Sequence, residues 1–425
     1  MTTNRQPRRA SRSRRTFSSD RSSVSPRGRH TKHRSSSGRG HSRSSSGRRT
    51  KSGRVMPTFD PSQFINKNPI ETVSEVYEPS HSFVDFKLNR KLTSTILSMG
   101  IQTPSPIQDQ IIPHILEGKD VIGLAETGTG KTAAFLVPLI EKTLKEYSRQ
   151  TIILCPTREL AIQVEDEFRK LAAGHKLYSV VCVGGTSIRP QIQKLRRQNH
   201  FIIGTPGRVQ DLIDQHKIKM ERTTTVVLDE ADRMLDMGFI HDIKRILTDV
   251  PAEREMLLFS ATLNDATEKI VHDFLRDPVV VSVKKKDVTN SIAQDVVRYL
   301  EAEKFTTLTT LLNDADTYAR VIIFTAMKHQ AEKLAKELSR AGIKADSIHG
   351  NKSHGQRQRS LKQFKSGQVR VLVATDVAAR GIHVDNVSHV INYDLPNTFE
   401  DYVHRIGRTG RGDKRGQALT FVPTR

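Results

Sequence analysis

Short apolar runs alternate with longer amphipathic stretches from about residue 81 to the end of the chain. The runs TIILCPT, SVVCVGG, HFIIGT, TVVLDE and EMLLFSAT are rich in β-branched residues and are typical of buried strands. Between them, GFIHDIKRILTDV spaces its apolar residues for one face of a helix, at Phe239, Ile243, Ile246, Leu247 and Val250. Strands that alternate with helices predict a parallel sheet covered on both faces.

The alternation weakens across VKKKDVTNS (283–291) and resumes with RVIIFTA, RVLVATD, HVINYD and QALTFV. We therefore expect an α/β protein with two parallel-sheet domains, at 81–284 and 292–425, joined by a short linker at 285–291. In such sheets, ligands bind at the carboxyl ends of the strands. Polar residues that directly follow an apolar run are thus the first candidates for function.

Residues 1–54 differ sharply from the rest of the chain. They contain 17 Lys or Arg, one acid (Asp20), 15 Ser and a single aromatic residue, Phe17. Such a segment cannot bury enough apolar surface to fold, so we expect a disordered basic tail, followed by a connector at 55–80. The tail is either a solubility segment or a nonspecific anchor for polyanions. An organellar targeting role stays open, because transit peptides are also rich in Arg and Ser.

The cysteines and the apolar runs of the chain indicate the cellular compartment. Cys155 and Cys182 both lie in strand-like runs, where we expect buried free thiols and a reducing environment. No apolar run approaches the roughly 20 residues that span a bilayer, and the N-terminus has no apolar signal region. We expect a cytoplasmic protein with no membrane partner, although an organellar or nuclear location remains open because of the tail.

A glycine-rich loop follows the strand-like run DVIGLA. Backbone N–H groups of such a loop close around phosphates at the start of a helix. Lys131 is expected at the β- and γ-phosphates of a nucleotide, and the Thr132 hydroxyl on Mg²⁺. The predicted phosphate-binding residues are Ala125, Glu126, Thr127, Gly128, Thr129, Gly130, Lys131 and Thr132.

Three carboxylates crowd the end of another apolar run, in Asp229-Glu230-Ala231-Asp232. A nucleotide-bound Mg²⁺ supplies the positive charge that makes this cluster tolerable. Asp229 is then expected to face Mg²⁺, and Glu230 to polarise the water that attacks the nucleotide. For Asp232 and Asp236, a solvated turn at the strand end explains the carboxylates equally well.

With these motifs, the chain resembles the DEAD-box RNA helicases from about Phe83 to Val422, and IHGNKSHGQRQRSLKQF is most similar to the bacterial RhlE-like subgroup. The resemblance implies two tandem RecA-like domains. In GIQTPSPIQ it assigns the adenine edge to Gln108, and it assigns base stacking to Phe83. It links hydrolysis to strand separation through Ser260 and Thr262 of SAT. The RNA-backbone residues that it implies are Arg158, Gly184, Gly185, Thr205, Arg208, Arg357 and Thr375.

In the second domain, the motif HRIGRTGR completes the resemblance. Phosphoryl transfer spreads negative charge over the transferred group, which an arginine can neutralise. The family assigns this role to Arg408 and Arg411, and contacts across the cleft to His404 and Arg405. The chain departs from the family at His354, where Gln is frequent, at His383, where Asp is frequent, and at Ser105, which replaces Thr.

RNA contacts are expected to be largely independent of sequence. The chain has no Trp, and its Phe and Tyr residues lie mostly in apolar patterns, so we find no stacking platform. The preference for RNA follows from the resemblance alone. We expect a monomeric ATP-dependent RNA helicase that unwinds short duplexes or remodels ribosomal or other RNA–protein complexes. An ATP-gated RNA clamp and a DNA helicase remain as alternatives.

Overall fold

The computed structural model describes residues 64–66, 77–126, 128–283, 292–379, 384, 386–410 and 416–424. They form two α/β domains, each of which is described by itself below. The predicted disordered tail and the predicted linker lie outside the described residues, as do Thr127, His383 and Arg411.

The N-terminal domain is built on a parallel sheet with the strand order β3-β4-β2-β5-β6-β1-β7. Regular pairing joins its neighbours, for example Val121 with Leu257 on one side and with Val279 on the other. The strands are β1 (Val121–Leu124), β2 (Gln150–Leu154), β3 (Ser179–Cys182), β4 (Phe201–Gly204), β5 (Thr223–Asp229), β6 (Glu255–Ser260) and β7 (Val279–Ser282).

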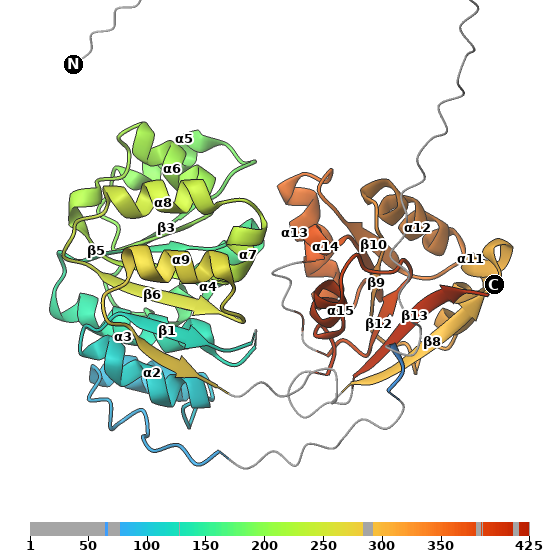
Figure 1. The fold of residues 1–425 in the computed structure, drawn as a ribbon, viewed down its shortest axis with the longest axis horizontal. Coiled ribbons are helices and arrows are strands. Elements are labelled where there is room, and N and C mark those ends of the chain that lie inside the picture. The colour runs from blue at the N-terminus through green and yellow to red at the C-terminus, as the bar shows by residue number, and fades with distance from the viewer. Residues whose placement is uncertain are drawn as a thin grey trace, which may run out of the picture. The chain divides into compact units, whose positions relative to one another are not determined.

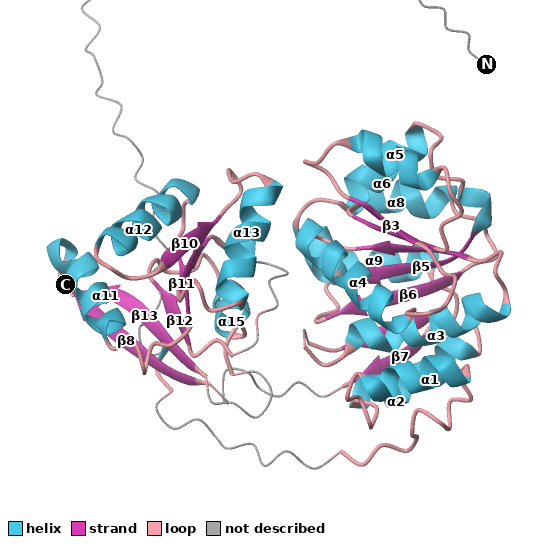
Figure 2. Ribbon diagram, turned by 180° about the vertical axis from the view of Figure 1, so that it is seen from behind, coloured by secondary structure: helices cyan, strands magenta, loops and turns pink. Residues whose placement is uncertain are grey.

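Helices cover both faces of this sheet (Figures 1 and 2). One face packs against α1 (Arg90–Ser98), α2 (Pro106–Leu116), α3 (Lys131–Lys145) and α4 (Arg158–Leu171). The other packs against α5 (Ile188–Leu195), α6 (Pro206–Asp214), α7 (Ala231–Asp236), α8 (Ile240–Asp249) and α9 (Asp265–Phe274). Because both faces are buried, the interior strands β1, β2, β4 and β6 are largely apolar, as the sequence predicts.

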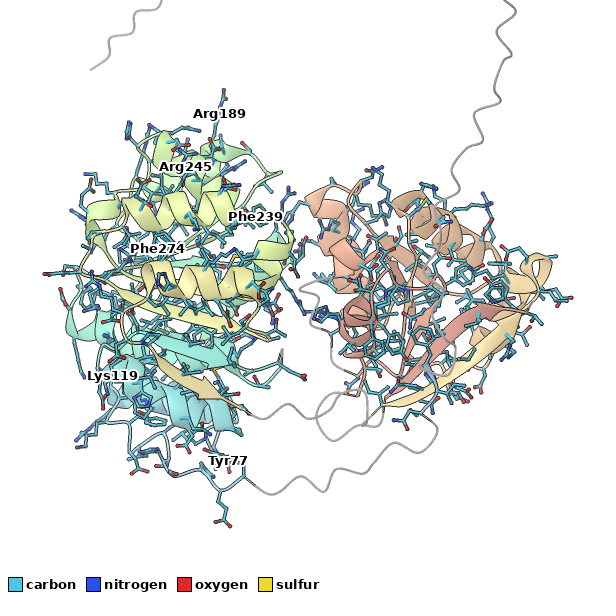
Figure 3. All side chains as sticks on the ribbon, viewed as in Figure 1. Tyr77, Lys119, Arg189, Phe239, Arg245 and Phe274 are labelled. Carbon is cyan, nitrogen blue, oxygen red and sulfur yellow. The ribbon has the colours of Figure 1, made fainter. Side chains whose placement is uncertain are left out.

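The amphipathic segment at 239–250 forms α8, which confirms the predicted helix. Ile243, Ile246 and Leu247 are buried against the sheet, and Phe239 packs at the edge of the same core. Figure 3 labels Phe239 on this face, together with Phe274 at the end of α9. The strand β7 was not foreseen, because its Val280 is exposed at the sheet edge and the run is short.

The C-terminal domain has a second parallel sheet, in the order β10-β11-β9-β12-β13-β8. Its strands are β8 (Ala293–Tyr299), β9 (Val321–Phe324), β10 (Ala345–Ile348), β11 (Val371–Ala374), β12 (His389–Asn392) and β13 (Gln417–Pro423). Its helices are α11 (Lys304–Asn313), α12 (Lys328–Arg340), α13 (His354–Lys365), α14 (Asp376–Ala379) and α15 (Phe399–Ile406). The short 3₁₀ helices Met220–Arg222 and Glu301–Glu303 complete the described elements.

Two pieces of the predicted connector make specific contacts. Asn66 pairs with Gln294 on the edge strand β8, and Phe64 is buried in an apolar cluster of the C-terminal domain. Tyr77, labelled in Figure 3, hydrogen-bonds to Asp109 of the N-terminal domain. The prediction of a plain connector was therefore incomplete, because short anchored pieces leave little trace in the apolar pattern.

Both cysteines are buried and free, as predicted. Burial raises the pKa of the Cys182 thiol to about 12, so this thiol stays protonated at neutral pH. In the part of the chain that the structure describes, no helix has the length and apolar character needed to cross a membrane.

Candidate nucleotide and RNA sites

The phosphate loop joins the end of β1 to the start of α3. Gly128 and Gly130 have φ angles of 94° and 93°, a region that favours glycine, and the helix begins directly after them at Lys131. The Lys131 side chain is only 6% exposed, and its ammonium donates a hydrogen bond to the Ala125 carbonyl at 2.9 Å. The loop therefore presents a helix N-terminus and a held cation where an anion can bind.

Asp229 and Glu230 lie at the carboxyl end of β5, in the same sheet as the strand that leads into the loop. They are 2% and 3% exposed. Burial raises the pKa of Asp229 to about 7, the charge of Lys131 opposes this shift, and the charge of Glu230 adds to it. The loop cation and the acidic pair are thus close enough to influence each other.

Glu230 occupies a strained position. Its φ of 55° is unusual for a residue other than glycine, and such strain is concentrated at functional sites. One carboxylate oxygen pairs with Arg233 at 3.0 Å, while the other is buried without a hydrogen-bond partner among the described residues. A buried acceptor left in this state is costly unless a ligand or water completes it.

These residues fit a nucleotide-bound Mg²⁺. Mg²⁺ is held by few protein oxygens, together with phosphates and water, and does not need a dedicated cage of side chains. Accordingly, the described residues contain no cluster of three His, Cys, Asp or Glu that could hold a metal alone. The half-buried Thr132, in the first turn of α3, and the buried Asp229, at the end of β5, supply suitable oxygen donors at the same edge of the sheet.

Asp232 links the acidic motif to the SAT segment. Its carboxylate accepts hydrogen bonds from the backbone N–H groups of Ala261 and Thr262, both at 3.1 Å, and from the Thr262 hydroxyl at 3.2 Å. Ser260 accepts a bond from the Asp232 N–H and donates one to the Thr262 carbonyl. The solvated-turn interpretation is therefore wrong for Asp232, which is 6% exposed, whereas Asp236 is exposed.

The Q motif contacts the phosphate loop directly. The Gln108 amide accepts a hydrogen bond from the Ser105 N–H at 3.0 Å and donates one to the Gly130 carbonyl at 3.1 Å. The Ser105 hydroxyl donates to the Thr129 carbonyl at 2.8 Å, so Ser in place of Thr keeps this contact. In this structure Gln108 supports the loop, and its predicted role at adenine requires part of its amide to change partners.

Phe83 is held in the core rather than exposed as a stacking surface. It is 1% exposed, and its ring meets Phe86 edge-on at 5.9 Å. The segment before it is fastened by Asp109, whose carboxylate accepts bonds from the Tyr77 hydroxyl and from the Ser80 and His81 N–H groups. Base stacking by Phe83 stays a prediction. The sequence did not indicate the role of Asp109, because its hydrogen-bond partners lie about 30 residues earlier in the chain.

The predicted RNA-binding residues of the N-terminal domain gather at the ends of β2, β3 and β4. Arg158 begins α4, and its guanidinium covers Gly185, where a side chain would collide with it and where φ is 68°. Burial lowers the pKa of Arg158, and the nearby charge of Arg208 adds to the shift. Arg208 also has a buried Nη1 atom without a hydrogen-bond partner in the described part of the chain. Two close cations with an unmet donor form a suitable site for phosphate.

The sheet order separates the two sets of residues. The predicted RNA set follows β3, β4 and β2, and the nucleotide set follows β5, β6 and β1. Because all these strands are parallel, both sets lie along one edge of one sheet. Thr205, Gly184 and the SAT segment belong to the same edge.

The predicted arginines Arg405 and Arg408 of the C-terminal domain are both buried, and Arg405 makes an extensive set of hydrogen bonds. Arg405 is 2% exposed and binds Asp376 through two bonds of 2.6 and 2.8 Å, Asn392 at 3.2 Å and the Asp394 carbonyl at 2.6 Å. In this structure it stabilises its own domain, which differs from the expected contact across the cleft. Arg408 is also buried, and its Nε donates to the His404 carbonyl at 3.3 Å.

The remaining predicted residues of this domain are placed as follows. Thr375 directly follows β11, and its carbonyl accepts bonds from the Ala378 and Ala379 N–H groups. Arg357 lies in the first turns of α13, which begins at His354. Arg411 and His383 lie outside the described residues.

The phosphate loop, the acidic strand end and two parallel-sheet domains together define a two-domain RecA-like ATPase. Family models described as DEAD/DEAH box helicase and helicase conserved C-terminal domain match residues 105–270 and 303–413. The DEAD-box ATP-dependent RNA helicase CshA of Geobacillus kaustophilus is 46% identical over 346 residues, which cover 81% of this chain and 74% of that protein. The chain belongs to the DEAD-box family of ATP-dependent RNA helicases.

Other similarities agree with this membership. The ATP-dependent RNA helicase CshA of Listeria monocytogenes is also 46% identical, over 81% of this chain, and the match spans 66% of that relative's length. Among solved structures, S. cerevisiae Dbp5 bound to RNA and ADP BeF3 has a TM-score of 0.71 at 32% identity, covering 81% of this chain and 90% of that one. Mss116p bound to ssRNA and AMP-PNP has a TM-score of 0.73 at 29% identity, covering 82% and 76%. The RhlE-like subgroup stays a prediction.

Proposed function

We propose that the chain is an RNA-stimulated ATPase that unwinds short RNA duplexes or remodels RNA–protein complexes. The observation that carries the chemistry is Glu230: a buried carboxylate with a strained backbone and an unpartnered oxygen. It lies beside Asp229, whose pKa the charge of the phosphate-loop lysine influences. Buried acids with unmet hydrogen-bonding capacity, next to an anion-binding loop, are suited to phosphoryl transfer to water.

In this proposal each residue has one task. The loop from Ala125 to Thr132 encloses the phosphates, with Lys131 as the neutralising cation. Thr132 and Asp229 hold Mg²⁺, which would offset phosphate charge when bound. Glu230 orients water and accepts its proton, while Arg408 and Arg411 neutralise the charge that develops on the transferred group.

RNA is held through its backbone in the same proposal. Arg158 and Arg208 neutralise phosphates, and Gly184 and Gly185 allow close approach of the main chain, with Thr205 as a hydroxyl donor. Arg357 and Thr375 act in the same way in the second domain. Such contacts do not read base edges, so binding is independent of sequence. The network of Asp232, Ser260 and Thr262 is the connection through which the acidic motif is coupled to strand separation.

The cellular setting is part of the proposal. The bacterial relatives are named as RNA helicases, which supports action on RNA. The proposal adds a cytoplasmic monomer that acts on RNA, including ribosomal or other RNA–protein complexes. The basic tail adds salt-sensitive affinity for polyanions without a fixed geometry.

The test is Glu230→Gln, which keeps the side-chain shape and removes the base. ATP turnover in the presence of RNA should fall by about 10²-fold or more, while RNA and ATP still bind. Turnover within a factor of two of wild type would remove Glu230 from this role. In the wild-type protein, RNA should stimulate the ATPase more than DNA of the same sequence. Release of a short labelled RNA strand distinguishes a helicase from a clamp, which would bind without releasing it.

A further inference from the structure

A short piece of chain between the tail and the N-terminal domain is docked on the C-terminal domain. The Asn66 N–H donates to the Gln294 carbonyl at 2.8 Å, and the Gln294 N–H donates to the Asn66 carbonyl at 2.9 Å. This reciprocal pair extends the sheet by antiparallel strand addition at β8, which is otherwise an edge strand. An edge strand presents unpaired backbone groups, so it is a natural place for such an addition.

Phe64 anchors this piece. Its side chain is 1% exposed and packs with Ile292, Tyr402, Ile406 and Ala418. The ring centroids of Phe64 and Tyr402 are 4.7 Å apart with a 55° tilt, a favourable aromatic arrangement. Ile65 is 47% exposed, so Phe64 alone supplies the buried apolar side chain of this piece.

The floor of this pocket is itself fixed by a buried polar contact. The Tyr402 hydroxyl donates to Gln294 Oε1 at 2.8 Å, and both residues are buried. The Gln294 backbone therefore hydrogen-bonds to the docked piece, while its side chain accepts a hydrogen bond from Tyr402 on the floor of the pocket. The pocket takes one aromatic ring, and the neighbouring edge takes one extended residue.

We infer that β8 and α15 form a docking surface for the chain's own residues 64–66, which holds the N-terminal tail on the C-terminal domain. Along the sequence, the tail precedes the N-terminal domain and would be expected to leave from it. With residues 64–66 docked, the tail is instead attached to the chain at the C-terminal domain. The last residue of the basic tail, Arg54, is ten positions before Phe64, within roughly 35 Å of the anchor at full extension.

The same anchor gives the two domains a second covalent connection. Eleven residue steps separate the docked Asn66 from Tyr77, which is hydrogen-bonded in the N-terminal domain, so this connection spans at most about 40 Å. The anchor also packs on α15, the helix that carries Arg405 and precedes Arg408. The docking rests on these contacts alone, and only its consequence for RNA rests on the function proposed for the tail.

Hydrogen exchange on the full-length protein tests the docking. The Gln294 amide should be protected in wild type and exchange about tenfold or more faster in Phe64→Ala, because the added strand loses its anchor. Asn66→Pro, which removes one of the paired N–H donors without touching the apolar pocket, should act in the same direction. Ile65→Ala is the matched control and should exchange as wild type does. Equal Gln294 exchange in all four proteins would overturn the inference, and unchanged β9 amides would confirm that each variant is folded.

A crosslinking experiment tests where the tail departs. Because Cys155 and Cys182 are buried, a photoreactive label can be placed on Thr58→Cys alone. Crosslinks should map mainly to the C-terminal domain, and Phe64→Ala should spread them over both domains. The same map in both proteins would contradict the anchor. Deletion of residues 1–54 separates the two proposals: if RNA affinity is unaffected but the exchange result holds, the docking stands and the RNA role of the tail fails.

Discussion

Two carboxylates, one in each domain, have their pKa values moved in opposite directions. Burial raises the pKa of Asp229 to about 7. The pKa of Glu332, on α12, falls to about 2, first because the Ser347 hydroxyl hydrogen-bonds to it and further because His349, Lys336 and Lys352 contribute. In the C-terminal domain, hydrogen-bond donors and cations surround Glu332. In the N-terminal domain, Asp229 is buried beside a second acid, Glu230. A charge that is buried without enough partners in the free protein indicates a site that a ligand completes.

Arg405 extends the comparison to a cation. It is as buried as Asp229, yet four hydrogen bonds and the face of Phe324 satisfy it. Burial alone therefore does not distinguish a functional charge from a structural one. The distinction lies in whether the protein itself supplies the partners.

The largest expected effect is on the stability of the C-terminal domain. Arg405→Ala leaves Asp376 and the Asp394 carbonyl without their partner, and breaking such a buried pair costs about 3–5 kcal/mol. Hydrogen exchange of the β12 amides measures this loss. Arg340→Ala, at an exposed position on α12, is the control and should change stability by less than about 0.5 kcal/mol. A small effect for Arg405→Ala would mean that its bonds are not structural, and would favour the expected role across the cleft.

A smaller effect is expected on nucleotide selection. Gln108→Ala should raise the ATP KM and reduce the preference over GTP by an amount equivalent to about 1–3 kcal/mol, because a buried adenine edge loses its partner. Because Gln108 also hydrogen-bonds to the Gly130 carbonyl of the phosphate loop, the pattern of ATP and GTP binding distinguishes its two roles. If ATP and GTP weaken equally, Gln108 only supports the loop; if the preference is lost, it also reads the base. Gln110→Ala, on the exposed face of the same helix, should behave as wild type.

Glu332 should show a modest effect with a clear pH dependence. Its pKa is lower in the folded protein than its usual 4.5, so its contribution to stability is full above about pH 4.5 and is lost as the pH falls towards 2. Because the side chain is 36% exposed, Glu332→Gln should cost at most about 1 kcal/mol at pH 7 and less at pH 3. Denaturant unfolding at both values checks this, with Glu337→Gln as control. A loss that grows towards pH 3 would reverse the assignment.

The smallest effect on chemistry should come from the tail, which contains none of the residues predicted to bind or hydrolyse the nucleotide. Deletion of residues 1–54 should leave the saturated ATPase rate nearly unchanged. RNA affinity should fall at low salt, and the slope of log K against log salt should become shallower, because fewer counterions are released. The loss should be similar for unrelated RNA sequences and nearly vanish at high salt. Superimposable salt titrations for the full-length and truncated proteins would leave the tail a solubility or targeting segment.

The sequence predicts the buried strands and the residues at their ends well, because strands covered on both faces are apolar throughout. Edge strands are harder. β8 reads AQDVVRY, with polar residues among the apolar ones, and β10 reads ADSI, so neither stands out from a loop. Two-domain architecture follows from the repeated alternation, even though these strands were not identified.

The parts of the site that sequence could not predict are those that depend on distant partners. Asp232 resembles a solvated turn until the SAT segment, 28 or more residues later, is folded against it. Arg405 resembles other arginines of its motif until Asp376 and Asn392 are brought to it by α14 and β12. Phe64 and Ile65 stand alone in a polar stretch, which is too short a pattern to indicate an anchor. Motif spacing identifies residue types that can act, and only the packed structure shows which of them are already engaged.

The position of β5 in the sheet has a consequence for genetics. It lies between β2, which leads to the predicted RNA residues, and β6, which leads to the SAT segment, and it ends in the acidic pair itself. Alleles that separate RNA binding from ATP turnover should therefore be found in the loops after individual strands. Alleles within β5 should abolish both traits together.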